Sequence, residues 1–243
     1  MYDKARFLPA GDKALVVELG DSISPELNRK VHDLVTAIEG RGTTGVTDLV
    51  PTYRSLLVQY DPLQTSTLQL QASLSEIEQG LSEGTPIIPR IIHIPTLYGG
   101  EHGPDLEFVA EGAGLRTEEV ISVHAGTDYL VYMMGFTPGF PYLGGLPEAL
   151  ATPRLSTPRV ETPSGSVGIA ESQTGVYPAA SPGGWRLIGC TPLSLFDPGR
   201  EPPALLAAGD YVRFVPLSAK AEYDSIHDLV QKGRYEVTEE TYQ

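Results

Sequence analysis

Residues 129–145 read YLVYMMGFTPGFPYLGG, an apolar run that passes directly into a loop of glycine, proline and aromatic residues. The first five residues have the composition of a β-strand. The loop that follows is too aromatic for a plain linker, and glycine and proline interrupt it too often for a core strand. The stretch therefore predicts a β-rich domain whose strands are joined by tight turns.

The wider segment 135–199 has the same character, with 11 glycines and 10 prolines among its 65 residues. Helices cannot run through that density, but short strands can. We expect strands at 129–133, 166–170, 186–189, 193–196 and 210–215, preceded by short helices at 104–114 and 117–124. These elements predict a closed, mostly β domain over residues 86–243.

The first 85 residues predict a separate α/β domain. Ser24-Pro25-Glu26 provides an N-cap hydroxyl, a proline for the first turn and an acid near the positive end of a helix. Apolar residues at helical spacing follow, with Gly40 as the expected end. The remaining expected elements are strands at 14–19, 46–50, 55–60 and 90–94 and a helix at 70–81. Their order is that of a ferredoxin-like domain at 1–85, with a linker at Gly84-Thr85-Pro86 and Pro89. The expected fold class is thus α+β.

Composition excludes several classes of protein. The chain has 243 residues, of which 41% are apolar and 20% charged, as in folded soluble proteins. Its net charge of −14 argues against nucleic acid or an anionic membrane as a partner. No signal peptide or membrane-spanning run is present, so a cytoplasmic location is expected. Cys190 is the only cysteine, which excludes disulfide scaffolds and zinc fingers, and no metal site is expected.

The usual catalytic motifs are also missing. No lysine occurs between Lys30 and Lys220, which excludes a Walker A lysine or a serine–lysine amidase centre in the middle of the chain. No nucleophile elbow, dinucleotide-binding glycine motif or zinc-protease motif is found. An anion bound there must be held by arginine or by backbone N–H groups.

The aromatic loop is one candidate site. Glycines let a ligand approach the backbone and aromatic rings supply apolar contacts, so Tyr132, Phe136, Gly139 and Tyr142 are candidate substrate-binding residues. The alternative is a loop that packs its own rings for stability.

His124 is the candidate catalytic histidine, because it lies at a predicted helix end just before a loop. The helix dipole favours an imidazolium there, and a neutral ring could act as acid or base. A capping or merely exposed histidine is the more common case.

Three further polar or aromatic residues complete the candidate set. Arg159, next to a hydroxyl-rich turn, is the second candidate catalytic residue and could bind a carboxylate with two hydrogen bonds. Gln173, which could donate and accept at a turn, and Trp185, which lies beside two glycines, are further candidate substrate-binding residues. Each also has a structural interpretation. Arg159 could pair with Glu161 or Glu171, Gln173 could fix a turn, and Trp185 could fill the barrel.

Several long strings resemble one family. Residues 129–147, 165–170, 173–178 and 181–185, with 191–198 and the upstream 98–106, are similar to the B subunit of 5-oxoprolinase. This family is also called the Kip inhibitor family and was formerly labelled allophanate hydrolase subunit 1. The resemblance is dense over about residues 90–216 and loose before them.

The resemblance implies a ferredoxin-like domain followed by a cyclophilin-like β-barrel. It implies that the chain acts with subunits C and A to hydrolyse 5-oxo-L-proline to L-glutamate, with ATP used by the complex. The family motifs place His124, Arg159, Gln173 and Trp185 at the polar face of the barrel. Which of the subunits holds ATP, the stoichiometry, and whether this chain acts alone do not follow from the sequence.

Some relatives of this family inhibit a sporulation histidine kinase, so a kinase-binding regulator is the alternative function. An allophanate hydrolase ranks last, because the amidase lysine is missing. The sequence departs from the family pattern at Cys190, where an arginine is expected, and Arg186 is the residue that could compensate.

Overall fold

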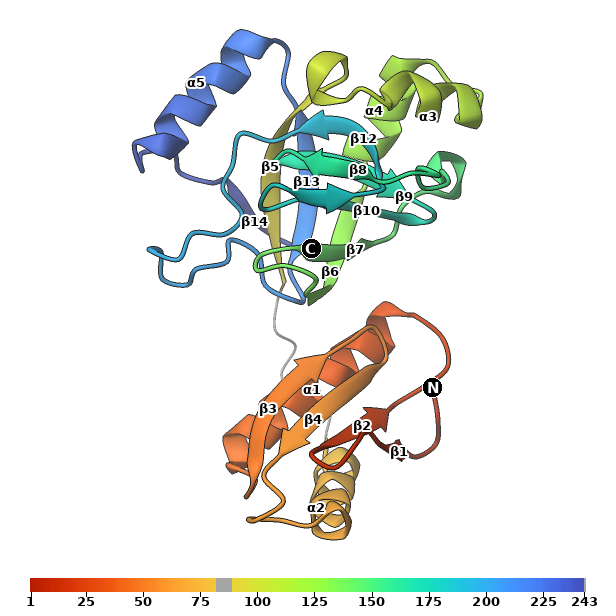
Figure 1. The fold of residues 1–243 in the computed structure, drawn as a ribbon, viewed down its shortest axis with the longest axis vertical. Helices are drawn as coiled ribbons and strands as arrows, with labels where there is room; N and C mark the ends of the chain where they lie inside the picture. The colour runs from red at the N-terminus through yellow and green to blue at the C-terminus, as the bar shows by residue number, and fades with distance from the viewer. Residues whose placement is uncertain (82–88, 243) are drawn as a thin grey trace. The chain divides into compact units, whose positions relative to one another are not determined.

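The computed structural model describes residues 1–81 and 89–242. The chain divides into two units, Met1–Ile87 and Ile88–Gln243 (Figure 1). The predicted boundary after residue 85 and the predicted linker Gly84-Thr85-Pro86 lie outside the described residues.

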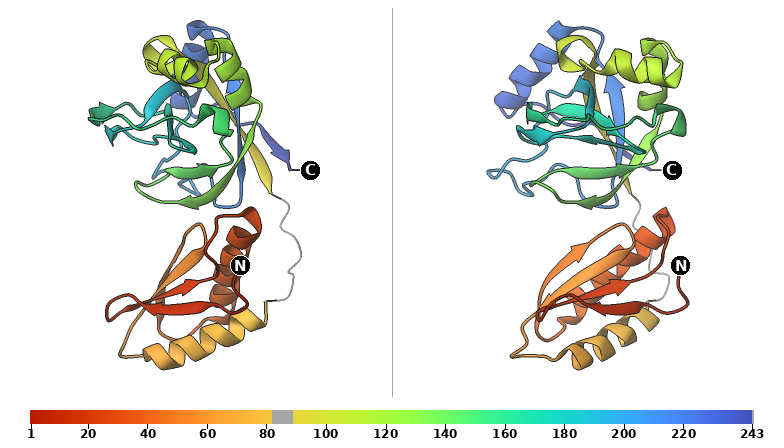
Figure 2. Two further views of the ribbon diagram at one scale, coloured as in Figure 1. Left: turned by 90° about the vertical axis from the view of Figure 1, so that its right-hand side faces the viewer. Right: turned by 45° about the vertical axis from the view of Figure 1, so that its right-hand side comes forward.

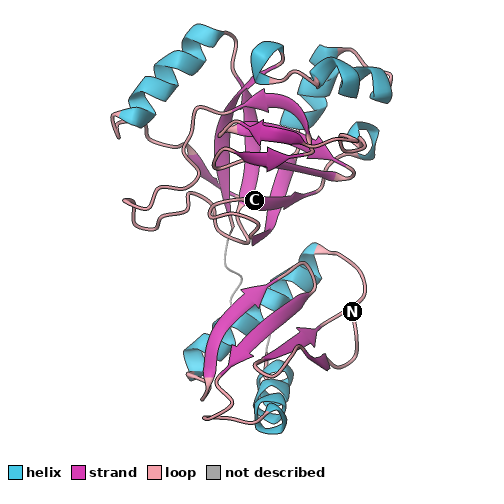
Figure 3. Cartoon of the chain, viewed as in Figure 1, coloured by secondary structure: helices cyan, strands magenta, loops and turns pink. Residues whose placement is uncertain are grey.

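The first unit contains a four-stranded antiparallel sheet with the strand order β1-β2-β4-β3. Its core joins alternate residues of β2 and β4 to one face of each helix, so both helices cover the same side of the sheet (Figure 3). Its elements are β1 (Arg6–Pro9), β2 (Ala14–Glu18), α1 (Pro25–Arg41), β3 (Val46–Pro51), β4 (Ser55–Tyr60) and α2 (Thr67–Gln79).

Helix α1 begins as the sequence predicts. The Ser24 hydroxyl accepts a hydrogen bond from the Leu27 N–H, Pro25 occupies the first turn, and Glu26 lies near the positive end of the helix. The helix ends at Arg41 and is capped by Gly42, two residues beyond the predicted Gly40, and Gly42 adopts the left-handed conformation that glycine tolerates best.

The strand at 90–94 is a correction to the predicted first domain. These residues belong to β5 of the second unit, where they pair in parallel with β13. The edge of the first sheet beside β2 is occupied instead by β1, which the sequence pattern misses. The ferredoxin-like classification of this unit remains a prediction.

The second unit is built around a closed barrel. Among the described residues, seven strands form the ring β12-β9-β10-β7-β6-β13-β5, which closes where Gly189 and Cys190 pair with Tyr98 and Leu97. The strands are β5 (Arg90–Tyr98), β6 (Asp128–Met134), β7 (Pro141–Gly144), β9 (Ser166–Ala170), β10 (Gln173–Val176), β12 (Arg186–Cys190) and β13 (Tyr211–Pro216). The chain therefore has a mixed α+β fold, and the cyclophilin-like classification remains a prediction.

Additional elements surround the barrel. Helices α3 (Leu106–Ala113) and α4 (Thr117–Ala125) pack on each other at one end, and α5 (Lys220–Gln231) lies against β5 (Figure 2). Strand β14 (Glu239–Thr241) pairs with β5 outside the ring, while β8 (Arg159–Thr162) and β11 (Ser181–Gly183) pair only with each other. Short 3₁₀ helices span Gly100–His102 and Glu148–Leu150.

Most predicted barrel strands are confirmed, and 166–170 matches β9 residue for residue. The stretch 193–196 is not a strand. Its Leu193 and Leu195 are buried in the barrel core from a loop, so apolar composition alone misleads there. Of the described helices, none is long and apolar enough to span a membrane.

Candidate functional site

Trp185 packs in an aromatic cluster that is separate from the main barrel core. Its ring meets Phe140 and Tyr177 edge to face, with ring centroids 5.8 and 6.2 Å apart. Phe140 in turn contacts Tyr142 edge to face. Trp185 therefore covers the outside of strands β9 and β10. The alternative interpretation of the sequence, in which Trp185 fills the barrel, is wrong.

Two glycines make room for this indole ring. A Cβ on Gly175 would lie 3.0 Å from the Trp185 Cζ3 atom, and a Cβ on Gly168 would lie 3.1 Å from the Trp185 Cβ atom. Side chains at either position would push the ring away from the sheet. Gly168 and Gly175 are thus needed for close approach of an aromatic ring.

Arg159 is held beside this cluster by two partners. Its Nη2 atom donates to the Asp105 Oδ2 atom at 2.7 Å, and its Nη1 atom donates to the Trp185 carbonyl at 3.0 Å. The partner is Asp105 and not Glu161 or Glu171. The same Asp105 oxygen accepts a hydrogen bond from the Leu187 N–H at 2.7 Å. Asp105 therefore fixes both the guanidinium and the strand that follows Trp185.

The other arginines nearby differ in their surroundings. Arg186 stacks on Phe108 with its Cζ atom 3.7 Å from the ring centroid, and its Nη1 atom lies 3.9 Å from Asp105 Oδ1. Arg154 is exposed, and its Cζ atom lies 5.9 Å from the centre of the Trp185 ring. In the described part of the chain, no carboxylate forms a salt bridge with Arg154. It is a positive charge at the edge of the aromatic cluster.

The predicted loop closes on itself and leaves one ring exposed. The Gly135 N–H donates to the Phe140 carbonyl, and the Phe140 N–H donates to the Thr137 carbonyl. Phe136 has a φ of 63° and is 64% exposed, with its ring 5.4 Å from that of Phe140. A left-handed φ is uncommon for a phenylalanine. Gly139, also left-handed, packs closely on the Phe196 Cβ atom and the Leu195 carbonyl.

The remaining predicted binding residues are not all gathered with Trp185. Tyr142 packs on the aromatic cluster, and Gln173, which is partly exposed, pairs with Ala170 in the β9–β10 ladder. Tyr132 lies over Gly144, where an added Cβ would be 2.2 Å from its ring. Burial and the neighbouring Tyr242 and Tyr132 raise the pKa of Tyr211, which places Tyr132 near the Tyr211–Tyr242 stack.

His124 lies inside the barrel and not at its rim. The prediction of a helix end is confirmed, because α4 ends at Ala125, but the ring is 0% exposed and packs on Phe214 and Tyr129. Both ring nitrogens are bonded: Nδ1 lies 2.7 Å from the Tyr98 hydroxyl, and Nε2 lies 2.9 Å from Thr174 Oγ1.

These contacts define the tautomer and the charge of the His124 ring. The Thr174 hydroxyl donates to the Gly168 carbonyl at 3.0 Å, so it accepts from Nε2–H, and the Tyr98 hydroxyl donates to Nδ1. Burial lowers the pKa of His124 to about 3, which outweighs the helix-end effect that favours an imidazolium. A neutral, fully bonded ring in this position connects β5 and β10, two strands that are not neighbours in the barrel. It touches no surface from which a ligand could exchange a proton with it.

Cys190 is buried in β12, with its Sγ atom 3.5 Å from the Tyr223 hydroxyl and 3.7 Å from the Ser164 carbonyl. Burial raises the pKa of this thiol. The position at which the resemblance leads us to expect an arginine is therefore enclosed in this chain.

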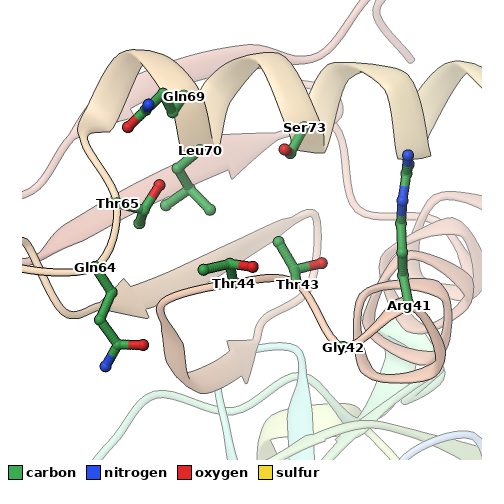
Figure 4. A pocket seen from close by; sticks show the side chains of 9 residues that line it. All are labelled: Arg41, Gly42, Thr43, Thr44, Gln64, Thr65, Gln69, Leu70 and Ser73. Atoms are coloured by element: carbon green, nitrogen blue, oxygen red, sulfur yellow. The ribbon is translucent and has the colours of Figure 1, made fainter.

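A separate hollow of about 350 Å³ lies in the first unit, between the end of α1 and the start of α2 (Figure 4). Its lining is largely polar, with Thr43 and Thr44 on one side, Ser73 of α2 on the other and Arg41 at one end. Arg41 also pairs with Glu76 at 3.3 Å. None of the predicted site residues belongs to it.

Sequence reasoning misses Asp105, Arg154 and Tyr177 as members of the aromatic site. Asp105 is 54 residues from Arg159, so no local spacing connects them. Tyr177 and Phe140 belong to the glycine- and proline-rich segment 135–199, and their aromatic side chains were the only sign in the sequence that they could join this site. Within residues 1–81 and 89–242, no three potential ligands among His, Cys, Asp and Glu gather as they would around a metal ion.

Residues 5–206 match the family described as carboxyltransferase domain, subdomain C and D. The chain is 45% identical over 224 residues to the 5-oxoprolinase B subunit of Bacillus subtilis (strain 168), covering 86% of this chain and 92% of the relative. It is 41% identical over 215 residues to the 5-oxoprolinase B subunit of Escherichia coli O157:H7, covering 88% and 96%. The Kluyveromyces lactis urea carboxylase structure matches 98% of this chain and 24% of its own chain with a TM-score of 0.80. At 20% identity, this last match concerns the fold alone.

Proposed function

The chain belongs to the carboxyltransferase domain, subdomain C and D family and, within it, to the B subunits of 5-oxoprolinase, and from this we propose that it is a component of an ATP-dependent 5-oxoprolinase. The complex hydrolyses 5-oxo-L-proline to L-glutamate. The observation that carries the proposal is identity of 41–45% to two proteins of that name over 86–88% of this chain.

The chemistry explains why ATP is needed. A lactam carbonyl is a poor electrophile, and phosphorylation of its oxygen would activate the ring for attack by water. The charge that develops on the oxygen needs donors that are fixed in advance. We assign the use of ATP to the complex as a whole, and the proposal places the nucleotide on none of its subunits in particular.

In this proposal the substrate meets the aromatic cluster around Trp185. The exposed Phe136 ring and the partly exposed Tyr142 and Gln173 provide contacts, and Gly139 shapes the loop that presents Phe136. Arg159 acts mainly by position, because its guanidinium is held by Asp105 and the Trp185 carbonyl. It keeps Trp185 in place and adds positive charge beside it.

His124 and Tyr132 have less direct parts in the proposal. His124 positions β10 through Thr174 from inside the barrel. Tyr132 lies in β6, the strand that leads into the aromatic loop, and its ring packs over Gly144.

The proposed partners are subunits C and A of the same enzyme, in the cytoplasm, and the chain alone is expected to be inactive. The B. subtilis and E. coli relatives both carry an enzyme-subunit name, which supports the enzyme partners and offers no support for a histidine kinase. A histidine kinase partner is therefore not part of the proposal.

The proposal is tested by co-expressing the three chains and measuring glutamate release from 5-oxo-L-proline with and without ATP. We expect release only when all three chains and ATP are present. Release that continues at the same rate when this chain is omitted would show that it is not part of the enzyme. Incubating this chain alone with substrate and ATP provides the control for independent activity.

A further inference from the structure

Two buried hydroxyl groups next to the aromatic cluster have no hydrogen-bond partner among residues 1–81 and 89–242. They are Thr162 Oγ1 and Ser181 Oγ, and each oxygen is shielded from solvent. The two residues face each other in the β8–β11 ribbon, and Thr162 is 0% exposed. Since buried polar groups are nearly always satisfied, a pair of idle hydroxyls indicates a missing partner.

A second hydroxyl lies close to that of Thr162. A Cβ added to Gly183 would lie 2.7 Å from Thr162 Oγ1 and 2.6 Å from the Tyr177 hydroxyl oxygen, so the absence of a side chain at Gly183 leaves room for both hydroxyls. Burial raises the pKa of Tyr177, and the Trp185 backbone N–H and the charges of Arg154 and Arg159 act against that rise. Two guanidinium groups are thus close enough to affect this hydroxyl.

The charges favour an anionic partner. Arg159 is already paired with Asp105, whereas Arg154 has no salt-bridge partner in the part of the chain that the structure describes. The Thr162 and Ser181 hydroxyls can each donate a proton to an acceptor oxygen. A group with negatively charged oxygens matches two free donors beside an unpaired arginine.

We propose that Thr162 and Ser181 bind a carboxylate oxygen of the substrate, with Arg154 supplying the opposing charge. This subsite rests on the proposed function, in which the substrate is a cyclic amino acid with one free carboxylate. Strands β8 and β11 pair with no strand of the barrel, so the ribbon can move to admit the carboxylate without breaking a barrel ladder. The bonds that such movement must release are those of Arg159 and of the Leu155 N–H to the Gly184 carbonyl.

The test compares the carboxylate-bearing lactam 5-oxo-L-proline with 2-pyrrolidone, the same ring without the carboxylate, and with two other anions. Binding of 5-oxo-L-proline, 2-pyrrolidone, L-glutamate and inorganic phosphate is measured by calorimetry on the full chain co-purified with its partner subunits. The variants are Thr162→Val and Arg154→Gln. The control is Thr152→Val, because the Thr152 hydroxyl is buried but already donates to the Leu150 carbonyl at 2.9 Å.

We expect Thr162→Val and Arg154→Gln to weaken binding of 5-oxo-L-proline by roughly tenfold or more and to leave 2-pyrrolidone, which lacks the carboxylate, unchanged. Thr152→Val should leave both affinities unchanged. The melting temperature of Thr162→Val should not fall, since the lost hydroxyl has no partner in the free protein.

Unchanged binding of 5-oxo-L-proline in Thr162→Val overturns the subsite and indicates that the hydroxyls hold only an internal water. A loss of affinity for 2-pyrrolidone as large as that for 5-oxo-L-proline also overturns it, because the carboxylate is then not the group that is recognised. Loss of phosphate binding without loss of carboxylate binding also overturns it. If the parent complex binds L-glutamate but not the lactam, the proposed function fails, and a loss of glutamate binding in Thr162→Val still supports the subsite. A parent complex that binds none of these carboxylates contradicts the subsite.

Discussion

The His124 side chain shows how one residue takes its role from its surroundings. Its two ring nitrogens join Tyr98 of β5 to Thr174 of β10, and the Tyr129 hydroxyl donates to the His124 carbonyl. A proton added to this ring would require the Tyr98 hydroxyl to turn away and would place a charge in an apolar core. The ring therefore works as a neutral connector between strands.

This arrangement predicts a loss of stability in acid. The folded pKa of about 3 lies below the ordinary value of 6.5, so the unfolded chain binds the proton first as the pH falls. The stabilisation is complete above pH 6.5 and is lost as the pH falls from 6.5 toward 3. Between pH 7 and pH 5 the free energy of unfolding should fall by about 2 kcal/mol from this group alone.

Denaturant unfolding of the parent and of His124→Gln at several pH values measures this effect. The variant should be less stable at pH 7 and should show the shallower dependence on pH. The exposed His227 gives the control, since His227→Gln should keep the slope of the parent. Parallel curves for the parent and His124→Gln would show that His124 does not control the acid sensitivity.

At the scale of elements, local signals predict some segments well and others not at all. Helix α1 could be predicted because its cap, its first-turn proline and its apolar spacing lie within 18 residues. Strand β1 could not, since burial of alternate residues is missing from an edge strand that is mostly exposed. The β8–β11 ribbon escaped prediction for a similar reason: it is short and pairs with no barrel strand.

The ribbon offers a test that uses adjacent glycines. Gly183→Ala would place a Cβ 2.6 Å from the Tyr177 hydroxyl oxygen, while the nearest atom to a Cβ on Gly184 is 3.7 Å away, on Pro158. We expect Gly183→Ala to lower the free energy of unfolding by about 1–3 kcal/mol and to change the fluorescence of Trp185, the only tryptophan. Gly184→Ala should stay within about 0.5 kcal/mol of the parent.

Denaturant unfolding and emission spectra of the two variants provide the comparison. Equal stability and identical spectra for Gly183→Ala and Gly184→Ala would show that the ribbon does not pack tightly on Tyr177.

At the scale of the whole molecule, the candidate site depends on contacts between distant parts of the sequence. The two-part division and the barrel follow from composition, because glycine and proline are concentrated in one segment. The pairing of Arg159 with Asp105 and the meeting of Trp185 with Phe140 depend on how the strands close, which residue spacing does not record. The proposed function comes from the family resemblance, and the folded chain shows which of the predicted site residues lie together.

The most direct test of the account is a titration of this chain into fixed amounts of the other two subunits, with 5-oxo-L-proline and ATP in excess. The account predicts that glutamate release is absent without this chain, rises as it is added, and reaches a plateau at a fixed ratio of the subunits. ATP hydrolysis coupled to glutamate formation should follow the same curve. A rate of glutamate release that does not change with the amount of this chain would contradict the account.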